Sequence, residues 1–211
     1  MSEFKDNIDI QKKLHSQGPI VLVLGAGPKL AAGRINIDIL DLPETDIVAD
    51  LEYGLPFLPD NCVDEIQSNS FFEHIRNFGF LMEEMHRVLK PNGLISAFVP
   101  HFSNPYYYSD YTHKTFFGYY TFHYFSKNQK KLKRKVPHFY TKINFEVVSQ
   151  KMIFTSPFPK IKIIKEWLGK FINRRSKYQE LYEELLSPFF PCYGLEVNLR
   201  AIKHLTPSDT F

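Results

Sequence analysis

The sequence predicts an α/β fold built around a mostly parallel sheet. Three observations support this fold class: short apolar segments recur between residues 21 and 99, glycine or polar residues follow them, and an amphipathic helical pattern separates the last two. The chain has 211 residues, which is enough for one domain with a sizeable core. We expect a single domain over residues 1–211, with a core at about 18–101, an insert at about 102–140, and C-terminal strands and a helix at about 141–205.

The first predicted strand, residues 21–24, breaks into the turn Gly25-Ala26-Gly27. Glycine in such a turn lets backbone N–H groups approach a ligand closely. The third glycine of a dinucleotide fingerprint is missing, because Leu30 occupies that position. We expect the backbone of Gly25, Ala26 and Gly27 to contact a cofactor.

The second predicted strand, residues 35–38, ends on Asp38. A carboxylate at the carboxyl end of a strand in an open α/β sheet is placed to accept hydrogen bonds from both hydroxyls of a ribose. Dinucleotide folds put this acid roughly 20 residues after the glycine turn, whereas Asp38 follows Gly25 by 13 residues. The first crossover, residues 28–34, must therefore be shorter than a full helix.

The next two predicted strands also end in polar groups at this edge. The third ends on Asp50, and we expect Asp50 and Leu51 to contact the adenine of a nucleoside cofactor. The alternative is that Asp50 only caps a turn, a common role for aspartate after a strand. The fourth ends at Asn69 and Ser70, which would face the same crevice and contact the cofactor.

An amphipathic helix and a further strand complete the predicted core. Apolar residues between 78 and 89 fall at helical spacing, residues 90–93 form a helix stop and turn, and residues 94–99 form a buried strand. His74 precedes this helix. We expect it to be partly buried and hydrogen-bonded to a neighbouring loop.

In order and spacing, these segments resemble a class I S-adenosylmethionine-dependent methyltransferase of the small, type 11-like family. The matching motifs lie between residues 21 and 101: Gly25-Ala26-Gly27-Pro28, Asn36-Ile37-Asp38, Ala49-Asp50-Leu51, Leu55-Pro56-Phe57, Asp64-Glu65-Ile66, Glu73-His74-Ile75 and Arg87 to Gly93. The resemblance implies a Rossmann-like, doubly wound, seven-stranded sheet and S-adenosylmethionine as the cosubstrate. It also implies that predicted strands near residues 145–154 and 195–202 form a terminal antiparallel pair.

Two other functional classes stay open at this point. A non-catalytic binding scaffold with the same fold is compatible with the first strand, which lacks the acidic residue that the family commonly has there. An NAD-dependent oxidoreductase is disfavoured by the short interval between Gly25 and Asp38.

The insert after the last core strand is the expected acceptor site, because it is dense in aromatic and titratable residues. His101 follows that strand directly, and a neutral imidazole there could take a proton from an acceptor alcohol. Asp110 and His113 are similar to a pair found near the active site in relatives of the family, and we expect them to shape or activate the acceptor. The alternatives are that the aromatic residues cover a core and that Asp110 caps a helix. No recognised ligand spacing joins His101, Asp110 and His113, so we expect no metal site.

Composition limits the remaining possibilities. The formal net charge of +3 is mild for a dedicated nucleic-acid-binding protein. Two cysteines give no disulfide framework, and the sequence shows no signal segment or long apolar run, so we expect a cytoplasmic protein.

Two basic segments suggest partners. Residues 127–135 carry six lysines or arginines and no acid, which indicates either a solvated loop or a patch for an anionic acceptor such as a phosphorylated sugar or lipid-linked glycan. Residues 160–175 combine a helical apolar face with flanking lysines and arginines. That face either packs on the domain or a second subunit, or makes a peripheral contact with an anionic membrane. The sequence leaves the oligomeric state open.

Together these expectations describe a methyltransferase. The methyl group would pass by direct displacement to an oxygen or nitrogen of a small or glycan-type acceptor.

Overall fold

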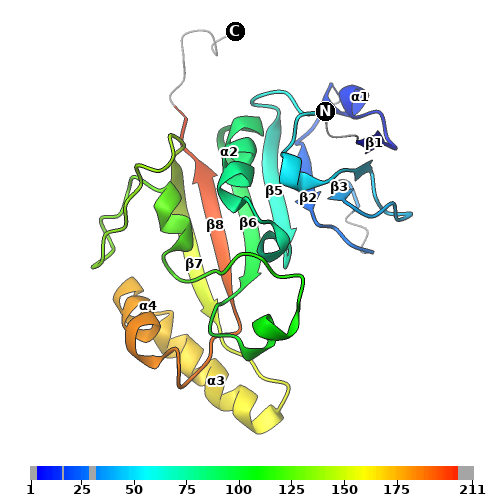
Figure 1. Ribbon diagram of the computed structural model, residues 1–211. Helices are drawn as coiled ribbons and strands as arrows, with labels where there is room; N and C mark the ends of the chain where they lie inside the picture. The colour runs from blue at the N-terminus through cyan, green and yellow to red at the C-terminus, as the bar shows by residue number, and fades with distance from the viewer. Residues whose placement is uncertain (1–3, 16, 29–31, 204–211) are drawn as a thin grey trace.

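The computed structural model describes residues 4–15, 17–28 and 32–203, and one mixed sheet runs through it (Figure 1). The strand order is β1-β4-β3-β2-β5-β6-β8-β7. The strands are β1 (Lys5–Asp6), β2 (Val21–Leu24), β3 (Ile35–Asp38), β4 (Ile47–Val48), β5 (Val63–Asn69), β6 (Leu89–Pro100), β7 (Phe145–Ile153) and β8 (Gly194–Ala201).

The sheet is parallel at its centre and antiparallel at both edges. Strands β4, β3, β2, β5 and β6 run parallel, and β8 pairs antiparallel with both β6 and β7. The predicted fold class and its terminal antiparallel pair are confirmed. The described residues contain eight strands rather than seven, because the two-residue strand β1 adds to β4 at the edge.

Helices occupy a minority of the chain. They are α1 (Ile10–Leu14), α2 (Phe78–Val88), α3 (Pro159–Ile172) and α4 (Ser176–Leu181), with short turns of helix η1 (Leu51–Tyr53), η2 (Phe72–His74), η3 (Pro105–Ser109), η4 (Thr121–Phe125) and η5 (Tyr182–Leu186). Figure 1 shows α2 lying across β5 and β6 on one face of the sheet, and α3 and α4 beyond the lower ends of β7 and β8.

Helix α2 confirms the predicted helical pattern. The side chain of Asn77 caps its first turn by accepting a hydrogen bond from the Phe80 N–H. Its buried positions are Phe78, Leu81, Met82, Met85 and Val88, which fall at the spacing of one helical face. These apolar side chains therefore pack α2 against the sheet.

Arg87, near the end of α2, connects this helix to a segment that precedes it in the chain. Its guanidinium bonds both carboxylate oxygens of Glu84 at 2.7 and 2.8 Å and Asp60 at 2.8 Å. It also donates to the carbonyls of Leu55 and Leu58. Arg87 thereby ties α2 to the loop that follows η1.

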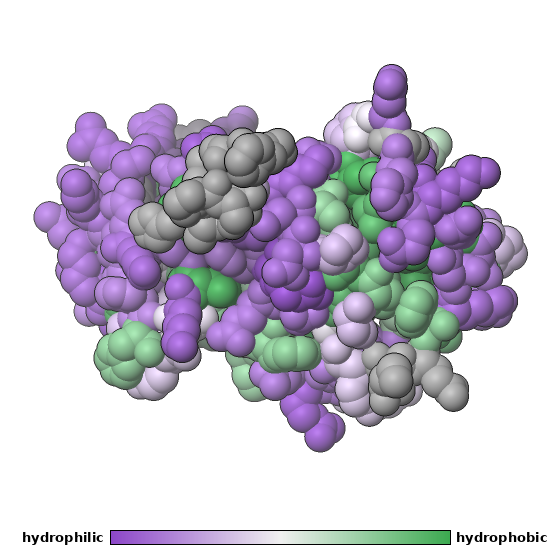
Figure 2. All heavy atoms as spheres, turned by 90° about the horizontal axis from the view of Figure 1, so that it is seen from above, coloured by the Kyte–Doolittle hydropathy of each residue, from purple (hydrophilic) through white to green (hydrophobic). Residues whose placement is uncertain are grey.

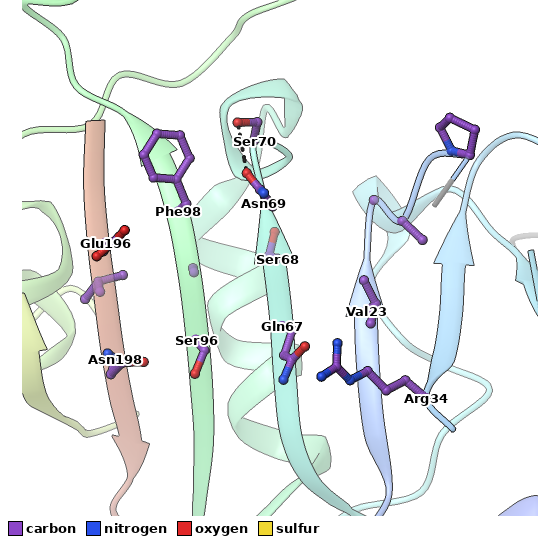
Figure 3. Close-up of a pocket in the computed structure, with 15 residues that line it drawn as sticks. Val23, Arg34, Gln67, Ser68, Asn69, Ser70, Ser96, Phe98, Glu196 and Asn198 are labelled. Carbon is purple, nitrogen blue, oxygen red and sulfur yellow. Dashed lines mark hydrogen bonds between the residues drawn. The ribbon is translucent and has the colours of Figure 1, made fainter. Parts of the chain in front are cut away.

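The opposite face of the central strands is polar. Gln67, Ser96 and Asn198 are direct cross-strand neighbours on β5, β6 and β8, so their side chains lie on one face. Figure 3 shows them projecting from the sheet toward the same open space. Among the described residues, the connections from β2 to β3 and from β3 to β4 contain no helix. The expected short first crossover is consistent with this, although its residues 29–31 lie outside the described part of the chain.

The amino end of the parallel strands is largely hydrophilic. Figure 2 looks onto this end and shows polar and charged side chains over most of it, with hydrophobic ones gathered on the right, the side of α1 and β1. No helix in the described residues is long and apolar enough to cross a membrane.

Candidate functional site

Two acidic residues meet at the carboxyl ends of neighbouring strands. Asp38 closes β3 and Asp50 follows β4, and these strands are parallel neighbours. Both residues line a cavity of about 500 Å³, which we call the strand-end pocket. Its lining residues are Asp38, Ile39, Ala49, Asp50, Leu51, Glu52, Phe71, His74, Ile75, Arg76, Tyr111, Thr112 and Lys114. The structure therefore brings Asp38, Asp50 and Leu51 together, as the strand-end rule predicts.

The Asp38 carboxylate also organises the glycine turn. One oxygen accepts the Gly27 N–H at 2.8 Å, and the other accepts the Leu40 N–H at 3.0 Å. Asp50 caps η1 by accepting the Glu52 N–H at 3.0 Å. The capping role considered for Asp50 is thus present, and it coexists with a place in the pocket wall.

The other predicted cofactor residues line a second cavity. Gly25, Ala26, Asn69 and Ser70 border a groove of about 780 Å³ over the polar face of the sheet, which we call the sheet-face groove. Figure 3 shows Asn69 and Ser70 at the end of β5 with a hydrogen bond between their side chains. The predicted cofactor residues are therefore divided between two cavities, joined by the Gly27–Asp38 hydrogen bond.

Phe71 packs against the glycine turn and lines the strand-end pocket. Gly25 has a positive φ of 64°, and a Cβ there would lie 2.5 Å from the Phe71 side chain. The missing side chain at Gly25 thus makes room for an aromatic ring. Sequence reasoning missed this role of Phe71, although a large aromatic residue directly after Asn69 and Ser70 was a usable signal.

The insert contacts the core at Glu73, next to the strand-end pocket. The backbone N–H groups of Lys114 and Thr115 donate to the carbonyl of Glu73 at 2.7 and 3.1 Å. This contact fastens the insert to η2. The Glu73 side chain is 1% exposed, and burial raises the pKa of its carboxyl to about 7.

His74 and the predicted pair Asp110 and His113 meet beside Glu73. Thr112 Oγ1 donates to Asp110 at 2.5 Å and lies 2.9 Å from His74 Nδ1. His113 Nε2 is 3.5 Å from Asp110 Oδ2. Burial, followed by the neighbouring His113, lowers the pKa of His74, so that its imidazole is neutral at neutral pH. The expected hydrogen bond between His74 and a neighbouring loop is present.

His101 lies apart from these groups. The structure buries it completely, and it lines neither the strand-end pocket nor the sheet-face groove. Its Nδ1 is 2.8 Å from Ser103 Oγ, and its Nε2 is 2.8 Å from a Glu183 carboxylate oxygen. As the structure stands, neither ring nitrogen is available to an acceptor. A base role for His101 stays a prediction that would require this arrangement to open.

The basic segments come together in space. Lys130 and Lys131 from one, and Arg174 and Arg175 from the other, line a cavity of about 370 Å³. Sequence reasoning treated the two segments separately, because nothing in their spacing showed that the loop reaches the end of α3.

The apolar face predicted within residues 160–175 is only partly covered. Ile172 is buried in α3, but Ile164 and Trp167 are 65% and 76% exposed. The domain itself therefore leaves the outer half of this face uncovered, and the expected contacts with a second subunit or a membrane stay predictions.

Comparison with known proteins finds one matching domain. A family model described as a methyltransferase domain matches residues 29–97, the stretch that holds β3, β4, β5 and α2. Over these residues the chain is similar to a methyltransferase domain. This match favours a methyltransferase over the oxidoreductase and non-catalytic alternatives, with S-adenosylmethionine as its cosubstrate.

Solved structures agree on the fold. The YcgJ protein from Bacillus subtilis is 12% identical over 93% of this chain and 97% of its own, with a TM-score of 0.53. The MccD protein is 15% identical over 91% of this chain and 94% of its own, with a TM-score of 0.50. No curated protein matches the sequence at a significant level.

The strand-end pocket of the methyltransferase suits the adenosine part of the cosubstrate. Its volume is in the range of small-molecule sites, and it combines the apolar Ile39, Leu51 and Phe71 with the carboxylates of Asp38 and Asp50. The fit is poorer at the glycine turn, because Phe71 covers Gly25, whose backbone we expected to contact the cofactor.

Proposed function

We propose that the methyltransferase transfers a methyl group to an oxygen or nitrogen of a small or glycan-type acceptor at the strand-end pocket. The observation that carries this proposal is the meeting of Asp38 and Asp50 in one pocket beside Thr112 and Lys114 of the insert. Asp38 accepts the ribose hydroxyls, and Asp50 with Leu51 contacts the adenine.

The cosubstrate supplies a methyl group on a positively charged sulfur, which loses its charge as the methyl leaves. The task of the protein is therefore alignment and exclusion of water rather than activation of the donor. Phe71, together with Tyr111 of the insert, supplies the apolar cover.

On the acceptor side, Asp110 and His113 are the groups we propose to shape the acceptor, because the structure holds them next to His74 at the pocket wall. For His101 we propose a positioning role through Glu183, whose other carboxylate oxygen accepts the Tyr119 N–H at 2.8 Å. A His101→Asn variant would then lower turnover without changing the shape of its pH profile between 6 and 8. A profile that loses an ionisation would restore His101 as the base.

The cosubstrate site is tested by the thermal shift that S-adenosylhomocysteine produces. We expect a clear rise in Tm for the wild type, and loss of that rise in Asp38→Ala. The matched control is Asp41→Asn, an exposed neighbour whose carboxylate pairs with Lys5. An Asp38→Ala protein that keeps its shift would contradict the assigned ribose site.

The acceptor class is tested separately, by incubating the protein with a labelled methyl donor and fractions of cell extract. We expect label in an anionic glycan or phosphorylated-sugar fraction, because four basic residues of the two segments share one cavity. Label found only in protein or nucleic acid would contradict this acceptor class.

We also propose that α3 rests on an anionic membrane surface. Ile163, Ile164 and Trp167 expose their side chains to 69%, 65% and 76%. The helix carries four lysines, and Arg174 and Arg175 follow it. An exposed apolar face with flanking cations is the pattern of a helix that lies in the lipid interface.

Cosedimentation with vesicles tests this contact. We expect binding to phosphatidylcholine vesicles that contain phosphatidylserine, weaker binding at high salt, and loss of binding in an Ile164→Glu, Trp167→Glu double variant. Val148→Glu is the control, because Val148 is an apolar residue on β7 that is 45% exposed and lies outside α3. If the double variant instead dissociates a dimer and leaves vesicle binding unchanged, a second copy of the chain covers this face and the proposal fails.

A further inference from the structure

Three metal-ligating side chains converge where the insert meets the core. Glu73 and His74 belong to η2, and His113 comes from the insert. One potential ligand atom from each lies within 4.8 Å of the other two. A zinc ion bound at about 2.0–2.2 Å by nitrogen and oxygen would hold such atoms somewhat closer. Small side-chain rotations therefore suffice to close the site.

The hydrogen bonds at Nδ1 of both histidines leave Nε2 as the ring atom that can bind a metal, and His113 Nε2 also lies 3.5 Å from Asp110 Oδ2. His113 Nδ1 lies 2.9 Å from the carbonyl of Tyr107, which can only accept, so Nδ1 carries the proton. The hydroxyl of Thr112 donates its proton to Asp110, so it must accept from His74 Nδ1. Metal-binding histidines are usually held in this way, with the second nitrogen donating to an outer group.

The carboxylate of Glu73 supplies the second, independent observation. Its residue is 1% exposed, and its Oε2 has no hydrogen-bond partner among the described residues. A buried carboxylate oxygen without a partner is costly, and buried polar groups in folded proteins are nearly always paired or bound to an ion. The two histidines each place a potential ligand atom within 4.8 Å of a Glu73 carboxylate oxygen.

We propose that Glu73, His74 and His113 bind one divalent transition-metal ion, with a remaining position open toward the strand-end pocket. Two imidazole nitrogens with one carboxylate favour Zn²⁺ or a neighbouring transition metal over Mg²⁺, which prefers oxygen ligands. His74 lines the strand-end pocket, so the site has an entry path. The ion fastens the insert to η2 and presents a coordination position to an acceptor atom. This inference does not depend on the acceptor class or on the membrane contact.

Equilibrium dialysis of the full chain against Zn²⁺ tests the site without any activity measurement. We expect one Zn²⁺ per chain in the wild type and at least a tenfold loss of affinity in Glu73→Gln and in His113→Asn. The matched control is His138→Asn, which removes an exposed histidine outside the cluster. The hydrogen bond between Thr112 and His74 is tested by Thr112→Val, which should weaken binding about tenfold by releasing the ring of His74.

Substitution with Co²⁺ keeps the test decisive if a buried variant fails to fold, because it needs only the wild type. A site with nitrogen ligands and few positions filled gives visible absorption bands, whereas Co²⁺ on surface carboxylates gives only the weak spectrum of the hydrated ion. Stoichiometric binding with strong bands supports the proposal. Three outcomes would overturn it: weak Co²⁺ bands, a wild type that binds Zn²⁺ no more tightly than the Glu73→Gln variant, or a wild type that binds Mg²⁺ in preference to Zn²⁺.

Discussion

At the scale of single residues, Gly25 and Phe71 form a matched pair. Gly25 adopts a positive φ of 64°, and the Phe71 side chain fills the space where a Cβ would stand. We predict that Gly25→Ala lowers the free energy of unfolding by about 1–3 kcal/mol, because it adds both backbone strain and a steric contact. Urea denaturation measures the change.

The double variant Gly25→Ala, Phe71→Ala separates these two causes. Removing the ring takes away the contacts with Cγ and Cδ2 but leaves the strain and the 2.6 Å contact with the Phe71 Cβ, so a double-mutant cycle should show partial favourable coupling between the two changes. Additive losses of stability would mean that the ring does not constrain this turn.

His123 gives a pH dependence whose sign follows from burial. Its residue is 8% exposed, and burial lowers its pKa from 6.5 to about 4, although Glu180 acts in the opposite direction. Between pH 6.5 and 4 the unfolded chain binds this proton more readily than the native protein. Burial of neutral His123 therefore costs no unfolding free energy above pH 6.5. As the pH falls below 6.5 the free energy of unfolding decreases, by about 2 kcal/mol at pH 5.

A His123→Asn variant should show a smaller drop in unfolding free energy from pH 7 to 5 than the wild type. The comparison between the two proteins cancels the contribution of other groups that titrate in this range, including Glu73, whose pKa is about 7. Parallel pH profiles would show that His123 is not the group responsible.

Residue-level expectations from the sequence succeeded where one geometric rule applied. Asp38 and Asp50 each end a strand, and parallel neighbours bring such ends to one edge. Glu73 escaped notice, because its chemistry arises from burial and from His113, which lies far along the chain. His101 also ends a strand, but the later segment around Glu183 encloses it. Contacts of this kind have no local signature.

At the scale of elements, the attachment of α2 depends on Arg87. Its bidentate contact with Glu84 and the bond to Asp60 raise the pKa of the guanidinium, so it stays charged. We predict that Arg87→Ala lowers the free energy of unfolding by about 2–4 kcal/mol, since it leaves the partly buried Glu84 and two carbonyls without their partner.

Arg87→Lys is the informative companion, because it keeps the charge but cannot form the fork of hydrogen bonds. Its loss should be a large fraction of the alanine loss in thermal or urea denaturation. A lysine variant as stable as the wild type would show that charge alone matters here.

Periodicity predicted the long elements well and their surroundings poorly. The spacing of Phe78 to Val88 fixed a buried helix, and apolar runs located β2, β5 and β6. The same kind of pattern in α3 did not reveal that Trp167 faces outward, because periodicity identifies an apolar face but not what covers it. The short helices η1 to η5 are below the length at which a period can be recognised.

At the scale of the whole molecule, the parallel order of the central strands followed from the succession of motifs. The short interval between Gly25 and Asp38 correctly indicated an abbreviated first crossover. The same interval could not indicate that the polar face of the sheet borders a groove of about 780 Å³. The combined basic cavity at the end of α3 was likewise invisible, because it depends on how a loop and a helix are placed.

That polar face has a thermodynamic consequence. A sheet that leaves one side to water removes less apolar area on folding than a sheet covered on both sides, and the heat capacity of unfolding scales with that area. We predict that calorimetry will give an increment below about 2.5 kcal/mol/K, the lower value for an average chain of this size. The curve of stability against temperature should accordingly be shallow, so that cooling weakens this protein less than most of its length.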